Sequence, residues 1–134
     1  MTGPSKLIPS ERQVQRSILQ MLGTCFPDVF AHHSPNGAHL AGGDGARFKQ
    51  IGALKGDGTK PGYPDLALYW NHGHALVEVK RPGCAKRVSP DQKAVHERLA
   101  ELSWPVAVVT SPEEVFELLK ARGAPCKAQW RVAA

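Results

Sequence analysis

The sequence predicts an α/β fold with a mixed central sheet flanked by helices, in the order helix, strand, strand, strand, helix, strand, helix. Serines followed by helix-starting patterns mark three helices, at residues 10, 89 and 111. Two apolar segments separated by Asn71-His72-Gly73 predict a hairpin. A short apolar run at 105–110 lies between the second and third helices. Its strand should therefore join the sheet through a helical crossover and run parallel to its neighbour.

The first helix is predicted to start at its N-terminal serine, because Ser10-Glu11-Arg12-Gln13 has the form of a capping box. Apolar side chains then recur at helical spacing and predict a buried stripe. They are Val14, Ile18, Met21 and Leu22. Gly23 is the expected stop of this helix. Residues 28–34 predict a short strand that ends before a turn at Asn36-Gly37.

The middle of the chain contains a glycine-rich segment followed by the predicted hairpin. Residues 38–62 are expected to include a short helix near 45–54, and the remainder is either a substrate-contacting loop or an irregular connection. The two strands of the hairpin are predicted at 65–70 and 74–80, and Arg81-Pro82-Gly83 ends the second one.

The second half of the chain predicts two helices around one strand. Ser89-Pro90-Asp91-Gln92 is a second capping box, with proline at the first helical position. The apolar residues of its helix are Val95, Leu99 and Leu102. Residues 105–110 are almost wholly apolar, a pattern typical of a strand buried on both faces. The last helix begins at Ser111 and ends near Gly123. Its apolar residues are Val115, Phe116, Leu118 and Leu119.

Length and composition indicate a single globular domain. The chain has 134 residues, 42% of them hydrophobic, with an expected core at about 10–119 and a basic tail at 120–134. No apolar run reaches membrane-spanning length, and the N-terminus lacks the apolar core of a signal peptide. The cysteines are far apart and form no CxxC pair, so neither a disulfide framework nor a zinc site is predicted. These features favour a reducing, cytoplasmic setting.

The formal net charge of +5 is concentrated in the middle of the chain. Residues 47–98 hold ten Lys or Arg against five acids, and residues 80–87 hold four cations and no acid. A positive surface of this kind attracts a polyanionic substrate, although a solvated basic loop has the same composition. The charge therefore points to a nucleic acid only in combination with the motif that it surrounds.

Two carboxylates and a lysine form the motif at the centre of this basic region. Asp65 follows Pro64 at the start of the first hairpin strand, and Glu78 and Lys80 lie two residues apart at the end of the second. Alternation along the strand puts Glu78 and Lys80 on one face, and the hairpin brings Asp65 beside them. Two carboxylates can hold Mg²⁺, and an adjacent lysine can steer a water or neutralise a phosphate oxygen. Each motif alone also fits a turn aspartate or a solvated strand edge, but unpaired charges beside so apolar a strand are costly.

Three stretches of the chain resemble a known nuclease family. They are 62–66 (GYPDL), 77–83 (VEVKRPG) and 89–93 (SPDQK). A Pro-Asp pair, a hairpin and then Glu-x-Lys resemble the signature of the PD-(D/E)XK nuclease superfamily. The three stretches in this order resemble its VRR-NUC family in the stand-alone phage and bacterial form, over roughly residues 10–119. The resemblance implies a restriction-endonuclease-like αβββαβ core, which agrees with the predicted order of elements.

The resemblance also implies roles for the motif residues. Asp65 and Glu78 would ligate Mg²⁺, for which Mn²⁺ substitutes, and the backbone carbonyl of Val79 would be a further ligand. Lys80 would orient or activate the attacking water, or stabilise charge that develops on the phosphate. The residues alone do not separate this role from that of a DNA-contacting lysine.

Two further residues have both a functional and a structural interpretation. Glu11 matches the acid that the superfamily commonly contributes from its first helix, but the helix dipole also favours an acid at this position. Gln92 matches the family's glutamine, which is expected to position water or phosphate, but it also occupies the third position of a capping box. The basic residues expected to contact DNA are Arg81, Lys86, Arg87 and Lys93. His96 on the same helix could also reach DNA, but it is expected to be an ordinary surface residue.

The resemblance implies a metal-dependent DNA endonuclease of a bacterial or phage-infected host cell. Its stand-alone members imply a homodimer that cuts branched DNA, notably four-way (Holliday) junctions. The candidate dimer surfaces are the last helix, with Phe116 and Leu119, and the tail bearing Trp130, unless these residues belong to the core. The alternatives are a non-catalytic DNA-binding module on a nuclease scaffold and a monomeric nuclease directed to flaps or nicks.

Overall fold

The computed structural model describes residues 7–35 and 52–128, and within them the elements follow the predicted order. The helices are α1 (Glu11–Cys25), α3 (Pro90–Glu101) and α4 (Pro112–Ala121), and the strands are β1 (Phe30–His33), β2 (Leu66–Trp70), β3 (Gly73–Val79) and β4 (Val106–Val109). Residues 52–56 are also helical and overlap the helix expected near 45–54. The rest of that helix, the predicted turn at 36–37 and Trp130 lie outside the described residues.

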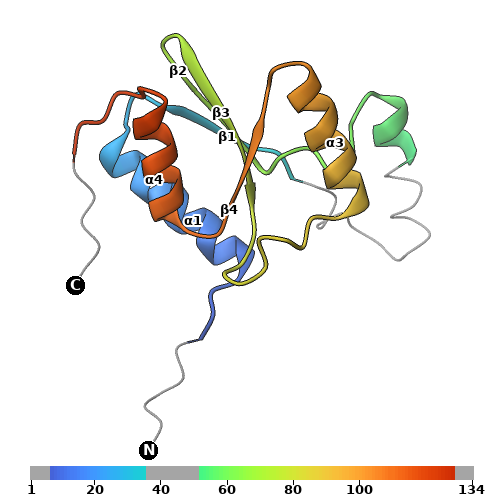
Figure 1. Ribbon diagram of the computed structural model, residues 1–134, viewed down its shortest axis with the longest axis horizontal. Helices are drawn as coiled ribbons and strands as arrows, with labels where there is room; N and C mark the ends of the chain where they lie inside the picture. Colours follow the sequence, from blue (N-terminus) through green and yellow to red (C-terminus); the bar gives the residue numbers. More distant parts are fainter. Residues whose placement is uncertain (1–6, 36–51, 129–134) are drawn as a thin grey trace, which may run out of the picture.

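The strands form one mixed sheet in the order β1-β2-β3-β4. β2 pairs antiparallel with β1 on one side and, through the predicted hairpin, with β3 on the other. β4 returns through α3 and pairs parallel with β3, as expected for a strand joined by a helical crossover. The predicted α/β architecture is therefore confirmed (Figure 1).

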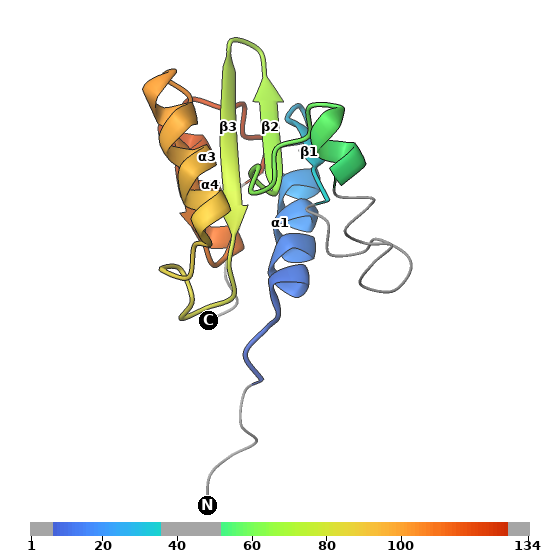
Figure 2. The ribbon, with the colours of Figure 1, turned by 90° about the vertical axis from the view of Figure 1, so that its right-hand side faces the viewer.

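Helices cover both faces of the sheet. Figure 1 shows α1 and α4 on one side of the strands and α3 on the other, and Figure 2 shows β2 and β3 side by side. The main core lies between the sheet and the layer of α1 and α4, which pack on each other. The predicted stripe of α1 is buried there. Its members are Val14, Ile18, Met21 and Leu22, joined by Cys25.

Three details of the fold differ from the prediction. α1 continues past Gly23, because Cys25 and Phe26 extend its buried stripe. β4 is an edge strand rather than one buried on both faces, and Val109 is its one fully buried residue. Every residue of α3 is at least partly exposed, and Leu102 is 50% exposed. The sheet face beneath α3 presents Glu78 and Lys80 as well as apolar side chains, so this helix covers a mixed surface.

The last helix closes the main core. Val115, Phe116 and Leu119 of α4 are buried, and the Phe116 ring meets Phe26 edge-on with centroids 5.4 Å apart. The suggestion that Phe116 and Leu119 form a dimer surface is therefore wrong, because both side chains are already covered within the chain. None of the helices in the described ranges has the length and apolar character needed to cross a lipid bilayer.

Candidate active site

The two predicted acids meet where β2 begins and β3 ends. Leu66 pairs with Val77 in the hairpin register, so Asp65, one residue before β2, lies opposite Glu78. Asp65 is half-buried, and its Oδ2 accepts a hydrogen bond from the Val79 N–H at 2.8 Å. Its backbone carbonyl accepts from the Ser34 N–H at 2.9 Å. Backbone groups on both sides therefore hold the aspartate in place.

Glu78 is a carboxyl group enclosed by the protein. Its side chain is 0% exposed, and Oε1 lies 3.3 Å from Nε2 of His96 on α3. Its Oε2 has no hydrogen-bond partner among the described residues. Burial, and after it the neighbouring Asp65 carboxylate, raise the pKa of Glu78 to about 9, although the Lys80 charge acts in the opposite direction. The carboxyl group is therefore costly to ionise without a bound metal cation.

Lys80 and Gln92 are joined directly. Lys80 is 7% exposed, and its Nζ donates to Oε1 of Gln92 at 2.8 Å. The same oxygen accepts from the Ser89 N–H at 3.0 Å, which is one of the two bonds of the α3 capping box. A single oxygen of Gln92 thus completes the helix cap and contacts Lys80. The structural role of Gln92 is therefore compatible with a role in the active site.

Gly62 brings the segment before Asp65 into contact with α3. Its φ is +87°, and a Cβ atom at this position would lie 2.5 Å from the backbone of Asp91 and Gln92. No side chain fits at that distance, and a positive φ also favours glycine. Gly62 therefore sets how closely the hairpin approaches the helix terminus that carries Gln92.

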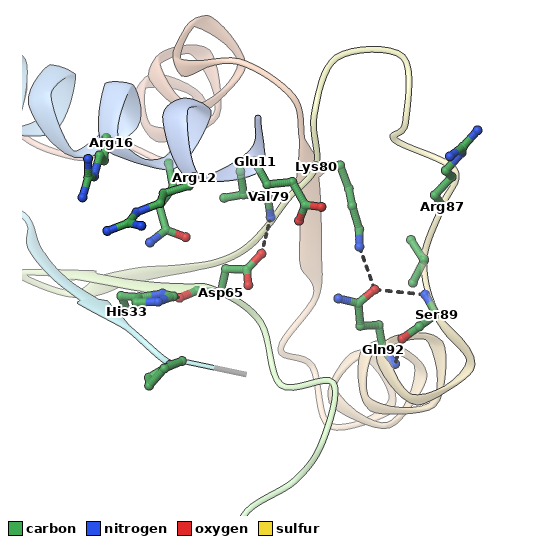
Figure 3. Close-up of a pocket in the computed structure, with 13 residues that line it drawn as sticks. Glu11, Arg12, Arg16, His33, Asp65, Val79, Lys80, Arg87, Ser89 and Gln92 are labelled. Atoms are coloured by element: carbon green, nitrogen blue, oxygen red, sulfur yellow. Dashed lines mark hydrogen bonds between the residues drawn. The ribbon is translucent and has the colours of Figure 1, made fainter. Parts of the chain in front are cut away.

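These elements surround a cavity of about 890 Å³. Figure 3 shows Glu11, Asp65 and Lys80 turned toward it, with Gln92 on the side of α3. The predicted site residues that line it are Glu11, Asp65, Val79, Lys80, Arg87 and Gln92. Glu78 is buried rather than lining the cavity. Three predicted DNA-contacting residues are exposed and lie outside the lining. They are Arg81, Lys86 and Lys93.

The cavity also contains residues that the sequence patterns did not identify. They are Arg12, Gln15 and Arg16 on α1, His33 on β1, and Pro35, Val88 and Ser89 in loops. Arg12 and Arg16 are four residues apart and therefore lie on the same side of α1. In the sequence, the signal for these two arginines is their four-residue spacing on the polar side of a helix that begins with a capping box.

His96 is not at the surface as expected. Its side chain is 15% exposed and faces Glu78 from α3. Burial lowers the pKa of His96 and the Lys80 charge lowers it further, whereas Asp65 acts in the opposite direction. The contact joins residues 18 positions apart, so no local pattern in the sequence reveals it.

The donor atoms fit a hard divalent cation. The Asp65 carboxylate disfavours the charged form of Glu78, and Oε2 of Glu78 is buried without a partner among the described residues. Within the described ranges, no three His, Cys, Asp or Glu side chains gather into a metal-binding group. The candidate set is two carboxylates, with the Val79 carbonyl as the further ligand that the family resemblance implies. Such a sparse set suits Mg²⁺, which keeps several of its waters.

Comparison with known proteins points to the family that the motifs resemble. The VRR-NUC domain family matches residues 10–113, which include every candidate site residue described above. A solved structure, a VRR_NUC domain protein, is similar with a TM-score of 0.56 and 23% sequence identity. The similarity covers 85% of this chain and 88% of that one, and it supports the fold. None of the curated proteins matches the chain.

Proposed function

This chain belongs to the VRR-NUC domain family, and from that premise we propose that it is a metal-dependent DNA endonuclease directed by DNA structure. Family membership implies a nuclease of the PD-(D/E)XK type that acts on DNA. The finer proposal is supported above all by the pairing of Asp65 with the fully buried Glu78. Two carboxylates opposite each other on neighbouring strands, one of them buried, favour a bound cation, whereas binding to DNA alone does not require them.

Asp65, Glu78 and the Val79 carbonyl would hold Mg²⁺, and Mn²⁺ would replace it. A cation bound there would stabilise charge on the phosphate and activate water for attack. Glu11 enters the same cavity from the first turn of α1 and would add a carboxylate beside the reacting groups. The raised pKa of Glu78 is the cost that cation binding would offset.

Lys80 would act on the attacking water or on the phosphate. Gln92 engages its Nζ at 2.8 Å, and an ammonium group has three donors, so two remain for the reaction. The low exposure of Lys80 keeps its charge close to the reacting atoms and weakly screened by salt. Gln92 would position this lysine, and its cap interaction with Ser89 limits its own movement.

Arginines on two elements would hold the phosphate backbone across the cavity. Arg12 and Arg16 extend from α1, and Arg87 extends from the loop before α3 (Figure 3). None of these three pairs with an acid inside 7–35 and 52–128, so their guanidinium groups are available to phosphates. The exposed cations outside the cavity would add attraction along the flanking DNA. They are Arg81, Lys86 and Lys93.

The specific form that we propose is a homodimer acting on four-way junctions. One set of Asp65, Glu78 and Lys80 cuts one strand, so paired cuts in a two-fold symmetric junction call for two copies. This part of the proposal is supported by the symmetry of the substrate and by the likeness to stand-alone members of the family.

A cleavage assay on nicked, flapped and four-way DNA of one sequence tests the proposal. We expect cutting of the four-way junction with Mg²⁺ or Mn²⁺, weak cutting with Ca²⁺, and none with EDTA or with the Asp65→Asn variant. Undiminished cutting in EDTA would refute the metal dependence. Cutting of flaps or nicks alone would favour a monomeric nuclease instead. Binding without any cutting would favour a non-catalytic DNA-binding module.

A further inference from the structure

Two polar side chains of α3 face β3 and Lys80, which follows it. The spacing of these two side chains along the helix matches the spacing of Glu78 and Lys80 along the strand. Gln92 and His96 are four residues apart, which is a rise of about 6 Å along a helix. Glu78 and Lys80 are two residues apart, which is about 6.6 Å along an extended chain. Gln92 contacts Lys80 at 2.8 Å, and His96 contacts Glu78 at 3.3 Å. One face of one helix therefore reaches both side chains of the Glu-x-Lys motif.

The chemistry of the second contact assigns its donor. A cation beside Glu78 would keep its carboxylate ionised, and an ionised carboxylate has acceptors only, so the hydrogen would then come from Nε2 of His96. Oε1 of Glu78 is then engaged, while Oε2 is buried and without a partner among the described residues. A carboxylate held at one oxygen cannot turn freely, so the direction of its second oxygen is fixed.

We propose that His96 is a positioning residue for the cation, because its Nε2–H holds Oε1 of Glu78 and leaves Oε2 to the metal. The inference rests on the proposed metal dependence and adds a residue outside the Pro-Asp and Glu-x-Lys motifs. Outer contacts of this kind orient ligands, and their loss typically weakens metal binding about 10–100-fold. Removing the donor should therefore lower cation affinity even though His96 never touches the cation.

Two substitutions of similar bulk separate the hydrogen bond from packing. His96→Gln keeps an N–H donor of similar reach, whereas His96→Leu fills the space without one. Glu97→Gln changes the next residue on α3, which is exposed, and serves as the control. Isothermal titration of Mn²⁺ into the full chain without DNA should show about 10-fold or greater loss of affinity for His96→Leu. His96→Gln and Glu97→Gln should stay close to the wild type.

The inference fails if His96→Leu binds Mn²⁺ as tightly as the wild type. It also fails if His96→Gln loses as much affinity as His96→Leu, since the donor would then be irrelevant. Thermal unfolding without metal shows whether each variant folds, and His96→Ala replaces the leucine variant if that one does not. A wild type that binds no Mn²⁺ would refute the metal dependence itself, together with the positioning role.

Discussion

At the scale of single residues, Lys80→Ala should separate cutting from binding. Its ammonium lies close enough to Glu78 to affect the charge of that residue, and we propose that it acts on the attacking water or on the phosphate. Its loss should therefore slow cleavage by about 100-fold or more, which is the usual effect of removing a group that assists proton transfer. Lys80 is one of 17 Lys and Arg residues, so DNA affinity should change little. Single-turnover cleavage and fluorescence anisotropy measure the two effects. Lys55→Ala, at an exposed lysine outside the cavity, is the control. Near wild-type cutting by Lys80→Ala would make Lys80 a binding residue.

Glu78 should make the stability of the metal-free protein depend on pH. Its pKa is raised from 4.5 to about 9, so between these values the folded state keeps a proton that the unfolded state has released. The free energy of unfolding therefore falls as pH rises. The contribution of Glu78 is complete below about pH 4.5 and is lost as the pH rises through about 9.

Thermal unfolding in EDTA measures this dependence. We expect Tm to fall more steeply with pH for the wild type than for Glu78→Gln, which has no proton to lose. Mg²⁺ added at high pH should raise the Tm of the wild type, because a cation favours the ionised carboxylate. Parallel pH profiles for the two proteins would show that Glu78 ionises freely in the folded state.

At the scale of elements, the position of α3 against the hairpin depends on Gly62. Gly62→Ala should displace the start of α3 and weaken cutting, because the new Cβ would lie 2.5 Å from the backbone of Asp91 and Gln92. Gly58→Ala is the matched control, since Gly58 has φ +99° but nothing lies within 4 Å of its Cβ. Both variants carry a backbone strain of about 1–2 kcal/mol. Equal effects of the two on Tm and cleavage would show that the close approach is unimportant.

α1 should act as a phosphate-binding element. Replacing Arg12 and Arg16 together by alanine should reduce the slope of log K against log salt by about 2, since each phosphate contact contributes about 0.9. Arg98→Ala is the control, because Arg98 is exposed and paired with Glu101 at 3.1 Å. Anisotropy titrations at several salt concentrations measure the slopes. A slope equal to that of the wild type would place the DNA away from α1.

At the scale of the whole molecule, the proposed junction cutting requires two copies of the chain. Light scattering without DNA should give about twice the chain mass of 14.5 kDa. A four-way junction should then yield two nicked duplexes, because the two sites cut symmetric strands. A monomer at all concentrations that still cuts flaps would contradict the dimer and leave the nuclease assignment intact.

Helix starts, the α1 stripe and the hairpin could be predicted because each depends on residues that are close in sequence. The capping boxes at Ser10 and Ser89 close within three residues, and both form as expected. The placement of Asp65 opposite Glu78 also follows from a short turn and from alternation along two strands. The sequence by itself therefore determined the order of elements and the convergence of the motif.

Contacts between distant elements were decided by the tertiary structure alone. Periodicity shows that α3 has two faces, but not that one of them brings His96 onto Glu78. The burial of Phe116 likewise follows from the packing of α4 against α1, and the exposure of β4 follows from its place at the sheet edge. The pattern of apolar and polar residues along a helix or strand shows only which side chains lie on the same face of that helix or strand. Burial, charge pairing and cavities depend on which other surface that element meets, and only the folded chain determines this.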